Sequence, residues 1–308
     1  MAVNDISLTS GMRNNLLSLQ KTSDLINTTQ NRLSTGKKVN SPLDNPTNYF
    51  AAQTHLERAS DLTARKDGMA EAVQMVKAAD AGIKAVTSLI ESAKGVASSA
   101  AATSSATDRA NYAATFNTLM TQISELASDS GYRGTNLLTN DNQTVEFGQK
   151  TGTATLGING FNATAAGLTI DTASISSAAS SGGTASTSIT GTSVGGAALT
   201  AWNAIDGTGN VTSAATQAIQ SASSQLEGAL SALRTQSSKL SSNLSVVTTR
   251  QDFTSSMINT LQTGADNLTL ADMNEEGANM LMLQTQQNLG VTSLSMASQA
   301  AQAVMRLF

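Results

Sequence analysis

The 308-residue chain has no cysteine, only two prolines and one histidine, His55. The missing cysteine excludes disulfides, iron–sulfur clusters, cysteine nucleophiles and thiolate metal sites. Because His55 is the only imidazole, a Ser-His-Asp triad would have to use it, and it has no second histidine with which to form a metal pair. We therefore interpret His55 as an ordinary, partly exposed helical residue and predict no metal site.

Charged and aromatic residues are also scarce. Charged residues make up 13% of the chain, about half the usual share, and aromatic residues make up 3%. The net charge of −4 argues against a nucleic-acid groove. The sequence has no apolar run long enough to span a membrane and does not begin like a Sec-type signal peptide. Together these absences favour a structural protein.

The first forty residues have a coiled-coil-like pattern of apolar side chains. Large apolar residues recur every seven positions, with further leucines that widen the stripe: Met12, Leu19, Ile26 and Leu33, then Leu8, Leu16 and Leu25. Gly36 is predicted to stop this helix. A second helix is predicted from Asn45, the N-cap, and Pro46, its first residue, to about Gly95.

The middle of the chain loses the helical period. A third helix, containing Phe116 and Leu126, is predicted to end before Ser130. From about residue 139 to 212, glycine, serine and threonine dominate, and the runs 153–158 and 168–171 alternate as short strands do. Residues 174–196 have the composition of a flexible linker. We predict a small β-rich insert here.

Residues 219–268 give the clearest helical signal in the chain. Fifteen positions follow a strict alternation of three and four, and 11 of them are apolar. They predict one helix of about fifty residues, roughly 75 Å long. After Leu268 the register changes, and Asp272 is predicted to cap a further helix with Glu275 in its first turn.

This last helix stays amphipathic to the end of the chain. Its predicted seam includes Met280, Val291, Leu294, Ala301, Met305 and Phe308. Residues 1–40 have a net charge of +3 and residues 269–308 a net charge of −2, which favours pairing of the two ends. One helix pair cannot bury all these apolar stripes, so we predict contacts between copies that repeat into a helical filament. From the pattern alone, an intramolecular helical bundle is the alternative.

The predicted fold class is therefore mainly α, with long antiparallel helices, a terminal coiled coil and a small β-rich insert in the middle. Three segments resemble those of the bacterial flagellins, the subunits of the flagellar filament: NRLSTGKKVNSPLDNP at 31–46, SDSGYRGTNLL at 128–138 and QNLGVTSLSMASQAAQAVMRLF at 287–308. The resemblance covers about 1–140 and 215–308 but not the insert.

The resemblance implies three domains. Residues 1–42 with 269–308 would form an inner coiled-coil core, residues 43–145 with 213–268 a helical outer-tube domain, and residues 146–212 a variable surface insert. The implied function is a structural subunit that polymerises into the extracellular flagellar filament for swimming motility. Export through the flagellar type III apparatus would explain the missing signal peptide. A hook–filament junction protein of the same apparatus is the alternative.

The resemblance also implies partners. These are further copies of the chain, the flagellar cap, hook-junction proteins and an export chaperone, with an O-linked glycan possible on the insert and no nucleic acid or membrane. Many flagellins are detected by an innate immune receptor through an Arg, a Leu and a Glu. An ungapped alignment places Glu91, Gly95 and Thr118 at those positions, so this chain resembles the poorly detected class.

The sequence disfavours two other functional classes. An enzyme in the insert is not expected, because residues 151–212 have only two carboxylates, Asp171 and Asp206, and two aromatic residues, Phe161 and Trp202. We predict no catalytic residues and no cofactor. A monomeric coiled-coil adhesin is disfavoured by the low charge and by the apolar C-terminus.

Overall fold

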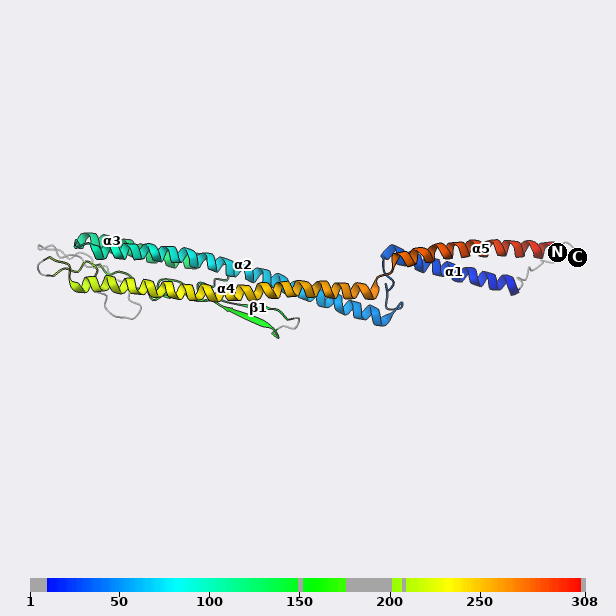
Figure 1. Ribbon diagram of the computed structural model, residues 1–308, viewed down its shortest axis with the longest axis horizontal. Helices are drawn as coiled ribbons and strands as arrows, with labels where there is room; N and C mark the ends of the chain where they lie inside the picture. Colours follow the sequence, from blue (N-terminus) through cyan, green and yellow to red (C-terminus); the bar gives the residue numbers. More distant parts are fainter. Residues whose placement is uncertain (1–9, 149–151, 176–200, 207–208, 306–308) are drawn as a thin grey trace, which may run out of the picture. The chain divides into compact units, whose positions relative to one another are not determined.

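The computed structural model describes residues 10–148, 152–175, 201–206 and 209–305, and the chain divides into two compact units (Figure 1). One unit comprises residues 1–60 and 257–308, and the other comprises residues 61–256. The elements are α1 (Ser10–Thr35), α2 (Pro46–Ala102), α3 (Ala106–Asp129), β1 (Asn142–Glu146), β2 (Thr155–Asn159), α4 (Ser213–Thr269) and α5 (Met273–Met305). The prediction of a mainly α fold with a small β insert is confirmed. Most of the predicted linker at 174–196 lies outside the described residues.

The ends of α1 and the start of α2 follow the predicted signals. Helix α1 ends one residue before Gly36, which has a φ of +70° and donates its amide to the Arg32 carbonyl at 2.8 Å. Glycine adopts this left-handed backbone conformation at little energetic cost, and a residue in it terminates the helix. Asn45 caps α2, because its Oδ1 accepts the Asn48 amide at 3.0 Å.

The predicted end of α2 near Gly95 was wrong. The helix continues to Ala102, and the side chains of Ala93, Ala97 and Ala100 are all fully buried around and beyond that glycine. A glycine inside a helix costs only about 1 kcal/mol relative to alanine, which the packing of these neighbours offsets.

The second unit is built around the antiparallel helices α2 and α4. Lys94 pairs with Glu227 at 2.7 Å, while Asp80, earlier in α2, accepts from Ser237, later in α4, at 3.1 Å. Helix α3 packs into the same core through side chains such as Phe116, which is fully buried. All fifteen predicted positions along α4 are buried or half-buried, so that periodicity is confirmed.

A buried arginine holds the turn between α2 and α3. The Arg109 guanidinium donates to the carbonyls of Thr103 at 2.8 Å and Ala101 at 3.5 Å, and to the hydroxyl of Thr216 at 3.2 Å. Burial lowers its pKa from the usual value. The positive charge lies beside the last carbonyls of α2, where the helix dipole favours a cation.

The insert is partly a β-hairpin. Strands β1 and β2 pair antiparallel with Val145 opposite Leu156, and Val145 and Ile158 are buried in the core of the second unit. The predicted strand at 168–171 was wrong. This segment is a turn in which Leu168 donates to the Thr164 carbonyl at 2.9 Å. Its alternation arises because Leu168 and Ile170 are both buried, not because the segment joins a sheet.

Gly160 follows β2 where backbone passes close to backbone. A Cβ there would lie 2.7 Å from the Leu137 carbonyl oxygen and would also collide with the carbonyl oxygen of Asp141. Because neither carbonyl can move without disturbing the loop, Gly160→Ala is expected to destabilise the second unit by about 2 kcal/mol. Gly157→Ala, inside β2 and with only an ordinary contact at 3.8 Å, is the control for denaturant unfolding. Equal stabilities would contradict the prediction.

Candidate functional site: the terminal helix pair

Helices α1 and α5 pack against each other in opposite directions. The Asn15 amide donates to the Ser293 hydroxyl at 3.3 Å, and Arg32, near the end of α1, pairs with Glu276, near the start of α5, at 3.0 Å. The predicted side-by-side pairing of the two ends is therefore present.

The inner face of this pair consists of one heptad stripe from each helix. Every member is buried or half-buried: Met12, Asn15, Leu19, Thr22, Ile26, Thr29 and Leu33 on α1, and Glu276, Met280, Leu283, Gln287, Gly290, Leu294 and Ala297 on α5. Leu19 lies over Gly290, since a Cβ on that glycine would be 2.6 Å from the leucine Cδ2. Thr22 satisfies its hydroxyl on the Ser18 carbonyl at 2.9 Å. The two helices therefore meet along a face that is only partly apolar.

The structure places the predicted seam residues in three groups. Met12, Leu19, Ile26, Leu33, Met280 and Leu294 lie on the inner face. Val291 lies outside it and is 56% exposed. Leu8 and Phe308, and the side chains of Ala301 and Met305, lie outside the described residues.

Sequence reasoning missed several members of the inner face, including the buried residues Thr22, Thr29, Glu276 and Leu283. The signal for them was present. Continuing the alternation from Met12 through position 15 reaches both threonines, and starting the C-terminal alternation at residue 276 reaches Leu283.

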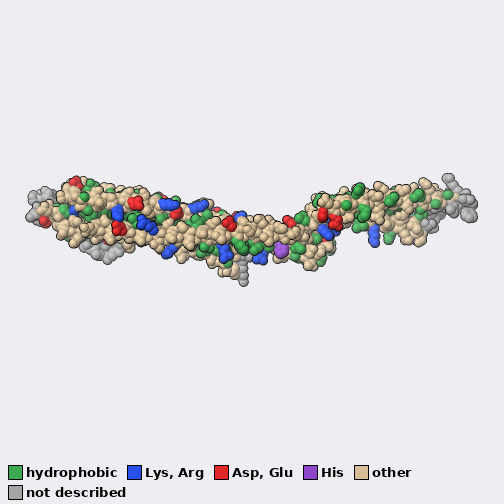
Figure 2. Space-filling view, in the orientation of Figure 1, with side chains coloured by type: hydrophobic (Ala, Val, Ile, Leu, Met, Phe, Trp, Pro, Cys, Tyr) green, Lys and Arg blue, Asp and Glu red, His purple; other side chains and the backbone are tan. Residues whose placement is uncertain are grey.

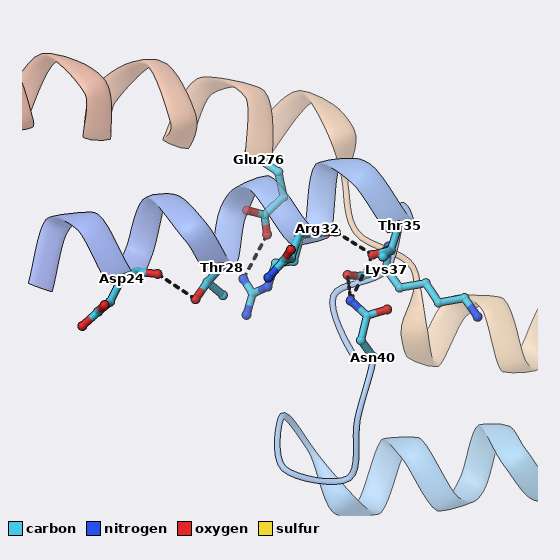
Figure 3. Close-up of polar contacts among 8 residues, drawn as sticks. Asp24, Thr28, Arg32, Thr35, Lys37, Asn40 and Glu276 are labelled. Atoms are coloured by element: carbon cyan, nitrogen blue, oxygen red, sulfur yellow. Dashed lines mark hydrogen bonds and ion pairs between the residues drawn. The ribbon is translucent and has the colours of Figure 1, made fainter.

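Polar contacts fix the end of the pair where α1 stops and α5 begins (Figure 3). There the Arg32 and Glu276 side chains point toward each other between the two helices, and Glu276 is buried. Backbone bonds join the same region, from Ala271 to the Gly36 carbonyl at 3.0 Å and from Lys38 to the Thr269 carbonyl at 2.7 Å. These contacts set the register of α1 against α5.

The predicted cap of α5 is confirmed. Asp272 Oδ1 accepts the Asn274 amide at 2.9 Å and the Glu275 amide at 3.3 Å. Its carboxylate thereby satisfies amides that have no partner within the helix, and its charge suits the helix dipole there.

The turn between α1 and α2 is organised by one carboxylate. Asp44 Oδ2 accepts the Asn40 amide at 3.0 Å, the Ser41 amide at 2.9 Å and the Ser41 hydroxyl at 3.2 Å. These bonds from the Ser41 and Asn40 backbone lower the pKa of Asp44 below its usual value. The turn holds Leu43 almost completely in solvent, at 95% exposed.

This turn is expected to loosen in acid. A lowered carboxyl pKa means that the ionised form stabilises the turn above the ordinary pKa, and that this contribution disappears as the pH falls through the lowered value. The Ser41 amide should therefore be protected from exchange at neutral pH, and its protection relative to the intrinsic rate should fall below about pH 4. In Asp44→Asn this protection should already be low at neutral pH, with no acid transition. A Ser41 amide that does not respond to either change would contradict this assignment.

The outer surface of the terminal pair is unusually apolar. Of fifteen exposed large hydrophobic residues in the described part of the chain, thirteen belong to the unit formed by residues 1–60 and 257–308. On α5, Met282, Leu289 and Met296 are 60–66% exposed and lie seven residues apart. We call these three residues the outer stripe. Figure 2 shows hydrophobic side chains on the visible face of this pair.

The outer stripe lies in a segment without charge. From Gly277 to Met305 the sequence has no acidic or basic residue, although a solvated helix usually alternates such side chains. A stripe with heptad spacing and no surrounding charge suits contact with another helix, not contact with water.

The three receptor-equivalent positions lie in the other unit. Glu91 and Gly95 are exposed on α2, and Thr118 is exposed on α3. In the described ranges, no group of three or more acidic or histidine side chains is placed to hold a metal ion. Among the same residues, no helix is long and apolar enough to span a membrane.

Long antiparallel helices, the pairing of α1 with α5 and an apolar outer stripe define a helical subunit built for assembly. Residues 6–143 match the family described as the bacterial flagellin N-terminal helical region. The whole chain is similar to flagellins FljO and FljK of Caulobacter vibrioides, with 30% and 29% identity over all of each chain. A 50-residue stretch, 16% of each chain, is 44% identical to flagellin C of Rhizobium meliloti. The chain belongs to the bacterial flagellins.

As a flagellin, it is a structural subunit of the flagellar filament and serves motility. Flagellins assemble by self-polymerisation, and the filament they form is extracellular. The predicted identity and function are therefore confirmed, and nothing favours the hook-junction alternative.

Proposed function

We propose that subunits of this flagellin contact one another through the outer faces of their terminal helix pairs. The observation that supports this most strongly is the outer stripe, in which Met282, Leu289 and Met296 are exposed at heptad spacing in an uncharged helix. A helix of another copy is the natural cover, because knobs at this spacing fit between the side chains of a facing helix.

The predicted seam then has two roles. The members on the inner face, such as Leu19 and Leu294, hold α1 against α5 and so present the outer faces. Val291, which is exposed, contacts a neighbouring subunit directly. Ala301, Met305 and Phe308 are proposed to continue the seam to the end of the chain.

The three-domain organisation is part of the same proposal. Residues 1–42 with 269–308 form the filament core, residues 43–145 with 213–268 the outer tube, and residues 146–212 the surface insert. The pairing of α1 with α5 supports the first of these domains.

The proposed cellular route follows from family membership. The chain is exported by the flagellar type III apparatus with the help of an export chaperone. Outside the cell it assembles beneath the flagellar cap, in a filament that starts from the hook-junction proteins. We propose that the insert can carry an O-linked glycan and that the chain has no enzymatic activity.

Electron microscopy of the purified chain, with and without filament seeds, tests the assembly proposal. Long filaments of uniform width that grow from the seeds are the expected result. A chain that stays monomeric and fails to extend the seeds would refute assembly through its terminal helices. A Leu294→Asp variant is the negative control and should not extend the seeds, because it places a charge on the inner face.

We also propose that the innate receptor detects this flagellin poorly. At the receptor-equivalent positions it has an acid, a glycine and a threonine, Glu91, Gly95 and Thr118, all exposed. Glu91 reverses the charge of the family's arginine, so it should repel an acidic partner group. A receptor reporter assay is expected to give little response at concentrations at which an ordinary flagellin is active. A full response would overturn the proposal.

A further inference from the structure

The methionines of the described residues range from buried to exposed, with Met12, Met257 and Met280 half-buried. Met69, Met75 and Met120 are between 0 and 8% exposed in the core of the second unit. Met273, Met282 and Met296 are between 48 and 61% exposed, and all three lie on α5. Two of them, Met282 and Met296, form the ends of the outer stripe.

We propose that Met282 and Met296 are oxidation sites that control assembly, with peroxide as the oxidant. The outer stripe accepts a neighbouring helix while both thioethers are reduced, and rejects it when they are sulfoxides. This inference rests on the proposed contact between subunits, and it adds a modification that regulates that contact.

The chemistry needs only the thioether and hydrogen peroxide. A sulfur lone pair attacks one peroxide oxygen, an S–O bond forms, and the O–O bond breaks. The sulfur is oxidised by two electrons, the peroxide is reduced, and the remaining oxygen leaves as water with both hydrogens. Because the reaction requires peroxide to reach the sulfur, the exposed sites on α5 should react before the buried core methionines.

The consequence follows from the character of the stripe. Methionine is flexible and polarisable and so adapts to an apolar partner surface, whereas its sulfoxide is polar. In the uncharged stretch 277–305, Thr285 and Thr292 lie between successive members of the stripe, three residues after Met282 and after Leu289. The hydroxyls of both threonines already donate to the carbonyls of Leu281 and Asn288 at 2.9 Å. A buried sulfoxide would therefore lose its water without gaining these hydroxyls as donors.

The first test is the order of oxidation. The monomeric full-length chain is treated with dilute hydrogen peroxide and mapped by mass spectrometry of its peptides. Met282 and Met296 are expected to be oxidised well before Met69, Met75 and Met120. Equal rates at all five positions would overturn the site assignment, whether or not the chain assembles.

The second test is seeded elongation. Oxidised wild-type chain is expected to elongate seeds about tenfold more slowly than untreated chain. Methionine sulfoxide reductases with a thiol reductant should restore the rate. The elongation rate of the double variant Met282→Leu with Met296→Leu, whatever its value before treatment, should not fall after peroxide, whereas the rate of the matched core variant Met75→Leu should fall as that of the wild type does.

The outcomes separate this inference from the function on which it rests. If untreated wild-type chain fails to extend seeds, the proposed subunit contact fails, and the peptide map alone decides the modification site. If untreated chain elongates and peroxide does not slow it, or slows the double variant equally, the regulatory inference is wrong while the contact stands.

Discussion

Leu289→Asp is expected to abolish seeded elongation without unfolding the subunit. Leu289 is 66% exposed in the single chain, so an aspartate there remains hydrated and costs the monomer little. In the proposed contact the leucine is buried by another helix, which contributes about 2 kcal/mol, and a buried carboxylate adds a penalty of several kcal/mol. Even about 3 kcal/mol at each contact weakens binding by about a hundredfold, and every subunit of the filament repeats the loss.

The matched control places the same charge outside the terminal helix pair. Ser245 is exposed on α4 in the other unit, so Ser245→Asp should reduce elongation far less. Circular dichroism should give both variants the helical content of the wild type. Normal filaments from Leu289→Asp would show that the outer stripe is not a subunit contact.

Helix positions could be predicted because their signals are local. Gly36 stops α1, Asn45 and Pro46 start α2, and Asp272 caps α5, all as expected from the chemistry of single residues. The long stripe of α4 was predictable for a different reason. It repeats over many turns, so occasional polar members such as Ser223 and Ser237 do not obscure it.

The errors arose where the local sequence pattern does not show which contacts a segment makes. The alternation at Leu168 and Ile170 reflects two side chains that enter the core from a turn, a tertiary contact invisible to a local pattern. On α5 the predicted alternation passes through Val291, which is exposed, as well as through Met280 and Leu294, which lie on the inner face, while a separate outer stripe lies on another side of the helix. A single amphipathic axis cannot be recovered from a helix that has apolar residues on two faces.

The inner face was hardest to predict because much of it is polar. Thr22, Thr29 and Glu276 are buried there, and a search for apolar residues passes over all three. The burial of Thr22 and Glu276 is offset because each has a specific partner, the Ser18 carbonyl for Thr22 and the Arg32 guanidinium for Glu276. Such pairing depends on the register of two helices separated by more than two hundred residues.

Arg32→Met is expected to destabilise the terminal helix pair. It removes the guanidinium that lies 3.0 Å from Glu276 and leaves that buried carboxylate without its cation. The cost of an uncompensated buried charge is several kcal/mol, and we expect about 2 kcal/mol here because the Arg32 side chain is 31% exposed and water can enter. Amide exchange along α1 and α5 should become faster, with no change in α3.

The double variant Arg32→Met with Glu276→Leu shows whether the pair stabilises the helices or selects their register. Two apolar side chains of similar volume remove both charges together, so the stability lost in Arg32→Met should be largely regained. The ion pair would then matter mainly because it disfavours arrangements in which α1 is shifted along α5. Without it, the small and apolar residues of the inner face would fit one another in more than one register. If the ion pair selects the register, the double variant should regain its stability but elongate more slowly than the wild type. Stability that stays as low as in Arg32→Met would instead show that the ion pair itself holds α1 to α5.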